Sequence, residues 1–168
     1  MKKKRAMTRR QKERLMFRMI ISLAVAVLIL LAAAFIFGLV RKIRWNDMLL
    51  DLSYSTASVG DEDVLCAEHG EEKVRVCYQN ALWLQNALQN GGMGKMQLFA
   101  PDEGDRIFLD YNGGTTMTIV ELEDDMAYLI YESPRMRFSS RLGYMTPFSK
   151  LETLTSAEGG SVPNQLWE

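Results

Sequence analysis

The sequence predicts an α+β protein in which a single N-terminal transmembrane helix carries a small extracytoplasmic domain. Three observations support this prediction: a stretch without charged residues at 19–40, a separation of charge on either side of it, and a series of strand patterns after residue 95. The net charge of the whole chain is only −1, so the overall composition conceals this organisation. A hydrophobic content of 48% permits a buried core.

The uncharged stretch has the length of a membrane-spanning helix. Its 22 residues would extend about 33 Å as a helix, and the hydrocarbon core of a bilayer is about 30 Å thick. Residues 1–18 carry nine Lys or Arg and one Glu, a net charge of +8, whereas residues 41–168 have a net charge of −9. Because positive residues stay on the cytoplasmic side, we expect a single-pass protein of the cell membrane with a cytoplasmic tail at 1–18.

The N-terminal segments permit other interpretations. Ala32 to Ala34 imitate the cleavage site of a signal peptide, but the apolar run continues to Val40, so we favour an uncleaved anchor. Small residues on one helical row would permit a homodimer in the membrane. They are Ser22, Ala26, Ala34 and Gly38. Membrane orientation and contact with the lipid bilayer explain the basic tail, and we predict no nucleic-acid binding.

Residues 41–60 are predicted to form a stalk and a linker. Residues 45–52 have apolar side chains at helical spacing and would prolong the membrane helix, with Trp45 as an aromatic anchor at the outer interface. Residues 53–60 are small and polar, which is typical of linkers. The folded domain is therefore expected to begin at residue 61.

The domain at 61–154 is predicted to contain a hairpin, a helix, an antiparallel meander of four or five strands and a short C-terminal helix. The hairpin covers 64–78, and the helix at 79–90 would end at Gly91. The strand patterns are MQLFA, RIFLDY, TTMTIVEL, MAYLIYE and RMRF. Asn112-Gly113 indicates a two-residue hairpin turn.

The C-terminal part of the domain is predicted to be helical. TPFSKLETL would begin its helix with Thr146 as N-cap and Pro147 at the first position, and its apolar residues share one side. We expect the helices to cover one face of the sheet. Residues 155–168 are predicted to be a disordered tail.

The hairpin contains both cysteines, Cys66 and Cys77, and the only histidine, His69. Outside the cytoplasm a disulfide is favoured, and a four-residue loop would pair the two cysteines directly. A two-residue turn at Gly70-Glu71 would instead set Cys66 against Arg75 and leave the sulfurs diagonal. Free thiols, and zinc bound by the cysteines and the histidine, remain alternatives.

Two surfaces are candidates for interaction. The helix after the hairpin has no charged residue, although helices that face only water usually carry Lys and Glu, so either it docks deeply on the sheet or it binds a partner. Its candidate residues are Trp83, Gln85, Asn86 and Gln89. Arg135 and Arg137 would share one face of a strand, where they either pair with acidic neighbours such as Glu132 or bind an anion or a partner.

No catalytic set is visible in the sequence. Nucleophilic catalysis needs a base beside the nucleophile, and the chain has one histidine and no nucleophile or phosphate-binding motif. Acidic clusters at 61–63, 102–105 and 123–125 raise the possibility of calcium, but an Asn-Gly hairpin explains the EF-hand-like spacing at Asp110 better. We assign no metal and no cofactor.

The sequence therefore indicates a non-enzymatic binding or assembly module of a cell envelope, whose partner is another envelope or membrane protein. The absence of N-glycosylation sequons is compatible with a bacterial source. The alternatives are an extracytoplasmic carboxylate-based hydrolase that acts on an envelope polymer, and a ligand- or metal-sensing domain.

Overall fold

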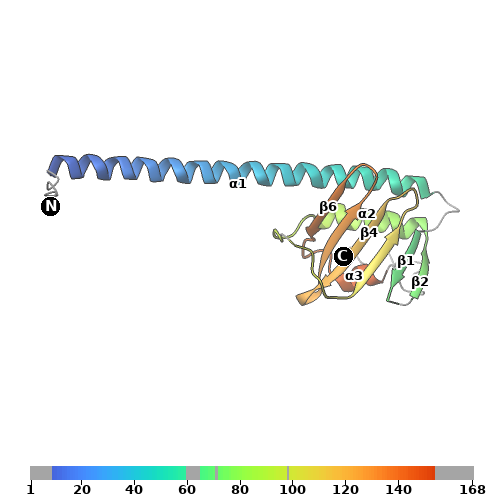
Figure 1. The fold of residues 1–168 in the computed structure, drawn as a ribbon. Coiled ribbons are helices and arrows are strands. Elements are labelled where there is room, and N and C mark those ends of the chain that lie inside the picture. Colours follow the sequence, from blue (N-terminus) through green and yellow to red (C-terminus); the bar gives the residue numbers. More distant parts are fainter. Residues whose placement is uncertain (1–8, 60–64, 71, 98, 154–168) are drawn as a thin grey trace, which may run out of the picture. The chain divides into compact units, whose positions relative to one another are not determined.

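A computed structural model of the protein describes residues 9–59, 65–70, 72–97 and 99–153, without the side chains of residues 11, 65–67, 69 and 72–74. The described chain is α+β, as predicted (Figure 1). Its elements are α1 (Arg9–Val59), β1 (Leu65–His69), β2 (Glu72–Val76), α2 (Tyr78–Gly91), β3 (Arg106–Asp110), β4 (Thr116–Leu122), a 3-10 turn (Glu123–Asp125), β5 (Met126–Glu132), β6 (Arg137–Arg141) and α3 (Phe148–Glu152). The chain divides into two compact units, residues 1–43 and 44–168.

In the first unit, the described residues form the N-terminal part of α1. The side chains between Met19 and Val40 are exposed, and one helix in the described part of the chain is long and apolar enough to cross a membrane. An exposed helix that is apolar on all sides is typical of a segment surrounded by lipid rather than water. The predicted apolar N-terminal helix is therefore confirmed, and its length and composition are those of a membrane anchor.

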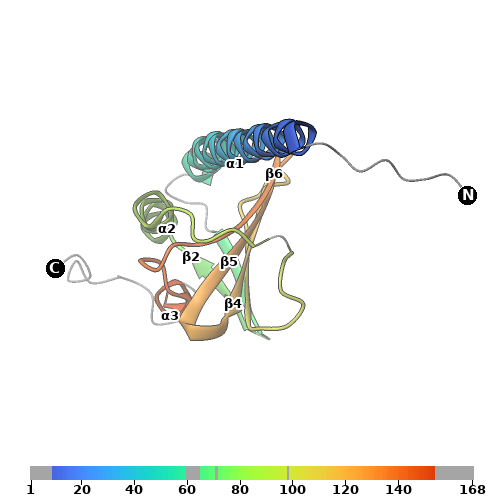
Figure 2. The same ribbon diagram turned by 90° about the vertical axis from the view of Figure 1, so that its left-hand side faces the viewer.

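In the second unit, an antiparallel sheet carries helices on one face. The strand order is β2-β1-β3-β4-β5-β6, so β3 to β6 form the predicted meander and the hairpin β1–β2 extends it beside β3. The residues of α1 from Arg44 onward, α2 and α3 contribute to one core on the same face of the sheet (Figure 2). The strand residues of this core are Ile107, Leu109, Met117, Ile119, Ala127, Leu129, Tyr131 and Phe138.

Residues 45–52 continue α1, as predicted, but residues 53–59 are also helical instead of forming a linker. Trp45, Met48, Leu52 and Val59 are buried in the core of the second unit, so this segment is not a free stalk. Intervals of three, four and seven residues place these side chains on one side of the helix. The ring of Trp45 lies 5.8 Å from that of Phe138, so Trp45 is a core residue rather than an interfacial anchor.

The small polar residues of the expected linker are also helical. Ser53 and Ser58 donate hydrogen bonds from their side chains to carbonyl oxygens three residues earlier, at 2.7 Å each. Such bonds satisfy the hydroxyl groups without breaking the backbone ladder. Thr56 is fully buried, and packing against the sheet therefore outweighs the low helix propensity of these residues.

The hairpin β1–β2 has the register of the shorter turn. Cys66 lies opposite Arg75, and Gly70 has a positive φ of 59° at the turn. Cys77 follows β2 as the N-cap residue of α2 and is a free cysteine, so the predicted disulfide register is wrong. The two registers differ by two residues, which leaves the same residues on each face, so the hydrophobic pattern could not distinguish them. A zinc site would need side chains outside the described part.

The hairpin β3–β4 is confirmed, but its turn is longer than predicted. Asn112, Gly113 and Gly114 all have positive φ, and the amide of Tyr111 donates to the carbonyl of Thr115 at 2.9 Å. This three-residue loop places Leu109 opposite Met117 on the core face. A two-residue turn would shift the register by one residue and move Met117 to the other face. Burial of the β4 side chains therefore selects the longer loop.

The C-cap of α2 and the N-cap of α3 each lie one residue after the predicted position. Gly92, with a φ of 64°, follows α2 instead of Gly91, and its amide donates to the carbonyl of Leu88. Pro147 precedes α3 in the N-cap position predicted for Thr146. Docking of α2 is through Asn80, Ala81, Leu84, Ala87 and Leu88, which are buried. The predicted tail at 155–168 lies outside the described residues.

A buried polar contact joins α1 to β5. The hydroxyl of Tyr131 donates to Asp51 Oδ2 at 2.9 Å. Burial, followed by the hydrogen bond to Asp51, raises the pKa of Tyr131 to about 12. Burial also raises the pKa of Tyr111, whose hydroxyl has no hydrogen-bond partner among the described residues.

These tyrosines predict a loss of stability at alkaline pH. An unfolded tyrosine ionises near pH 10, whereas folded Tyr131 keeps its proton to about pH 12, so the unfolded state binds fewer protons between these values and the free energy of unfolding falls as pH rises. Guanidinium unfolding at pH 8 and pH 11 measures this fall. Tyr131→Phe should make it smaller, and Tyr144→Phe, an exposed control, should not. Equal pH dependence in both variants would contradict the expectation.

Candidate functional site: an acidic cleft on the sheet

The segment between α2 and β3 crosses the face of the sheet that the helices leave uncovered (Figure 2). MQLFA, at residues 96–100, was expected to be a strand, but the described residues of this segment form no strand. Met93 makes one isolated bridge to Leu142, and the amide of Gly94 donates to the carbonyl of Arg141 at 2.8 Å. The chain then has to pass β6, β5 and β4 to reach β3, because β3 lies on their far side.

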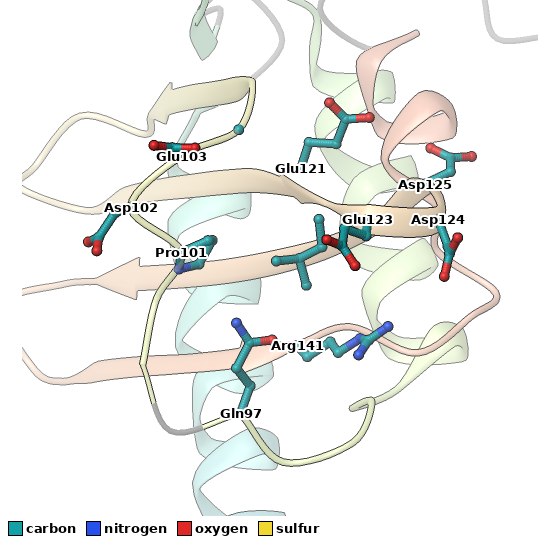
Figure 3. A pocket seen from close by; sticks show the side chains of 11 residues that line it. Gln97, Pro101, Asp102, Glu103, Glu121, Glu123, Asp124, Asp125 and Arg141 are labelled. Carbon is teal, nitrogen blue, oxygen red and sulfur yellow. The ribbon is translucent and has the colours of Figure 1, made fainter.

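This crossing creates a cleft of about 950 Å³ between the segment and the sheet (Figure 3). One wall comes from the crossing segment, and the other comes from the end of β4, the 3-10 turn and β6. The lining residues are Gln97, Pro101, Asp102, Glu103, Gly104, Glu121, Leu122, Glu123, Asp124, Asp125 and Arg141. Val120, next to this wall, is fully buried although it alternates with the core residues of β4.

The charge of the cleft is strongly negative. Six of its lining residues carry carboxylates and only Arg141 is cationic. Two of the three predicted acidic clusters, at 102–105 and 123–125, thus meet in space, and the third, at 61–63, lies outside the described residues. Within the described part, no group of three His, Cys, Asp or Glu side chains has the arrangement needed to hold a metal ion. The cleft is therefore a negatively charged surface open to solvent.

Asp125 has a structural role at one end of the cleft. Its Oδ1 accepts a hydrogen bond from the amide of Ser149 at 2.7 Å, and its Oδ2 accepts one from the Ser149 hydroxyl at 2.6 Å. These two bonds lower the pKa of Asp125, chiefly through the hydroxyl. Both oxygens of this carboxylate are thus engaged in fixing the start of α3.

The candidate residues of α2 lie away from the cleft lining. Asn86 and Gln89 are exposed, whereas Trp83 and Gln85 are half-buried. The Nζ of Lys150 lies 5.7 Å from the centre of the Trp83 ring, so α3 covers part of this side of α2. The indole N–H of Trp83 is buried and has no hydrogen-bond partner among the described residues. The exposed polar surface of α2 is therefore smaller than the sequence indicates.

The two candidate arginines do not share a strand face. Arg137 begins β6 and pairs with Glu132 at 3.5 Å, as expected for cross-strand neighbours. Arg135 lies in the turn between β5 and β6, because Ser133-Pro134 ends the strand, and it pairs with Asp51 of α1 at 3.4 Å. That contact was not predicted, since α1 was expected to end before the domain.

Comparisons with protein-family models, with curated proteins and with solved structures each gave no match.

Proposed function

We propose that the chain is a membrane-anchored binding module of a cell envelope, which uses its acidic cleft to hold a positively charged segment of another envelope or membrane protein. The observation that carries this proposal is the meeting of six carboxylates with a single cation in one open cleft. Electrostatic complementarity of this kind favours oppositely charged partners, steers their encounter and excludes others. The net charge of −9 on residues 41–168 also attracts positively charged partners.

The apolar helix supports the membrane part of the proposal. It has the length and composition of an anchor, and the charge of +8 before it favours a cytoplasmic N-terminus. With this orientation the second unit, and its cleft, would lie outside the cytoplasm. A tethered module searches for its partner at the membrane surface, which raises the effective concentration of partners that are also membrane-bound.

A carboxylate-based hydrolase is the second candidate, and the same cleft favours it. Hydrolysis of a glycosidic polymer needs one carboxyl group that stays protonated as general acid and a second that is ionised. Asp125 suits only the ionised role, because its hydrogen bonds to Ser149 lower its pKa. The general acid would have to be another residue of the cleft, and the binding function makes no such demand.

Site-specific crosslinking tests the binding function. In cells that make the full-length protein, a photo-reactive residue that replaces Gln97 in the cleft should crosslink to a partner. Glu123→Lys should lower the crosslinking yield about tenfold, because the new lysine repels a positively charged partner segment. Glu132→Lys is the matched control, since Glu132 is also exposed and lies outside the cleft lining. Equal crosslinking yields in the two charge-reversal variants would contradict the proposal. An equal yield from a photo-reactive residue at Asn86 on α2 would also contradict it.

A further inference from the structure

A second cavity, of about 360 Å³, lies between α1 and the turn that joins β5 to β6. From α1 it is lined by Arg44, Asp47, Leu50, Asp51 and Tyr54, and from the turn by Arg135 and Met136. The intervals between these α1 residues are three, three, one and three, so they follow one side of the helix. All of these residues belong to the second unit.

The cavity contains a positioned but accessible guanidinium group. Arg135 Nη1 lies 3.4 Å from Asp51 Oδ1, and its Cζ lies 5.8 Å from the centre of the Tyr54 ring. The Arg135 side chain is nevertheless 73% exposed, whereas that of Asp51 is 11% exposed. A guanidinium has five N–H donors, so one contact with Asp51 leaves donors for a ligand.

The turn itself is fixed by Ser133. Its Oγ accepts hydrogen bonds from the amides of Arg135 at 3.2 Å and Met136 at 3.1 Å. The second oxygen of Asp51 accepts a hydrogen bond from the hydroxyl of Tyr131. Arg135 therefore compensates the charge of Asp51, and the contact with Tyr131 of β5 fixes the position of its carboxylate.

The other charges of the cavity have fewer partners. Arg44 donates from Nη2 to the carbonyl of Arg137 at 2.6 Å, which orients its guanidinium without neutralising it. Asp47 is exposed and makes no ion pair within the described part of the chain. Its Cα lies about 6 Å along the helix axis from that of Asp51, which binds Arg135. Leu50 and Tyr54, 56% and 59% exposed, provide an apolar wall.

We propose that this cavity binds a zwitterionic group in which a phosphate ester and a primary ammonium are joined by a short linker, as in phosphoethanolamine. Arg44 and Arg135 hold the phosphate, and Asp47 holds the ammonium. Leu50, Tyr54 and Met136 contact the apolar carrier. A simple anion would be repelled by Asp47, and a simple cation by the two arginines, so the pattern of charges selects a ligand that has both.

Two sources can supply this chemistry: the headgroup of a bilayer phospholipid, or a soluble phosphoethanolamine ester. The lipid source rests on the proposed membrane anchoring, whereas the chemistry of the cavity does not. The proposal is also independent of the partner that the acidic cleft would bind, because none of the cleft residues line this cavity.

Native mass spectrometry of the full-length protein in detergent micelles tests the proposal. Phosphatidylethanolamine, phosphatidylglycerol and phosphatidylcholine are added in turn, and O-phosphoethanolamine is the soluble probe. Phosphatidylethanolamine should bind about tenfold more tightly than the other two lipids. Phosphatidylglycerol and phosphatidylcholine lack ammonium N–H groups that could donate hydrogen bonds to Asp47. Soluble phosphoethanolamine that binds as tightly as the lipid would support the site and assign it to the soluble source.

Variants distinguish this cavity from general attraction by basic residues. Arg135→Gln should weaken binding about tenfold, and Arg137→Gln, an exposed and ion-paired control that does not line the cavity, should leave it unchanged. Arg44→Gln provides a second variant if thermal unfolding shows that Arg135→Gln destabilises the protein through Asp51. Asp47→Asn should reduce the preference for ethanolamine over glycerol headgroups. Equal binding of all three lipids, no binding of any probe, or equal effects of the Arg44 and Arg137 substitutions would overturn the proposal.

Discussion

A fragment that begins at Arg44 is expected to fold, and a fragment that begins at Asp61 is expected to remain unfolded. The shorter fragment lacks Trp45, Met48, Leu52 and Val59, which are at most 5% exposed in the core. Burial of each such side chain contributes about 1.5–3 kcal/mol, so their joint loss approaches the whole stability of a typical domain. Circular dichroism and guanidinium unfolding of the two fragments measure the difference.

Two leucines of α1 provide a matched test within the longer fragment. Leu52 is fully buried and Leu50 is 56% exposed, although they lie only two residues apart. Leu52→Ala should lower the free energy of unfolding by about 2–5 kcal/mol, and Leu50→Ala should change it by about 0.5 kcal/mol or less. If the fragment from Asp61 folds cooperatively, or if both leucine variants are equally stable, residues 45–59 are not part of the core.

Substitution of Gly143 by Ala is expected to destabilise the second unit by about 3 kcal/mol. A Cβ atom at this position would meet the carbonyl oxygen of Gly91, and one at Gly94 would meet that of Leu142. The amide of Gly143 also donates to the carbonyl of Gly92 at 2.9 Å. Residues 91–94 and residues 141–143 are thus in backbone contact, and neither segment can move away without losing hydrogen bonds. Thermal or guanidinium unfolding of Gly143→Ala measures the effect.

Gly113→Ala is the control for this prediction. Gly113 has a positive φ of 63°, but a Cβ there would meet no atom within 4 Å. The cost should therefore be about 1 kcal/mol, the conformational penalty alone. A Gly143 variant as stable as the Gly113 variant would show that the two segments can separate, and that the crossing segment of the cleft is not fixed at its start.

The fold could be predicted from the sequence wherever the signal is local. The order of hairpin, helix, meander and final helix is confirmed, except for the strand predicted at MQLFA, because alternation and turn residues act over a few positions. The boundary of the domain was wrong because residues 53–58 have the composition of a linker. They are helical only because Trp45, Leu52 and Val59, on either side of them, pack against distant strands. The turn lengths were wrong because burial across the sheet, rather than the turn residues alone, selects the register.

The candidate site was less predictable than the fold. The acidic clusters at 102–105 and 123–125 were evident in the sequence, but their meeting depends on the path of the segment after α2, for which no local pattern exists. The partner of Arg135 was missed for the same reason, since Asp51 precedes it by 84 residues. Glu132, the partner of Arg137, lies five residues away across a tight turn and was among those expected.

The position of α1 in the fold also determines the order in which the second unit can assemble. Tyr131 lies 80 residues after Asp51, and the carbonyl that binds Arg44 lies 93 residues after it. Contacts of such long sequence separation form late and slow folding. During synthesis, Trp45 therefore lacks its ring partner Phe138 until β6 exists. The apolar side of the helical segment 45–59 therefore stays exposed for most of synthesis, and the rate at which the last strands become available limits when that exposure ends.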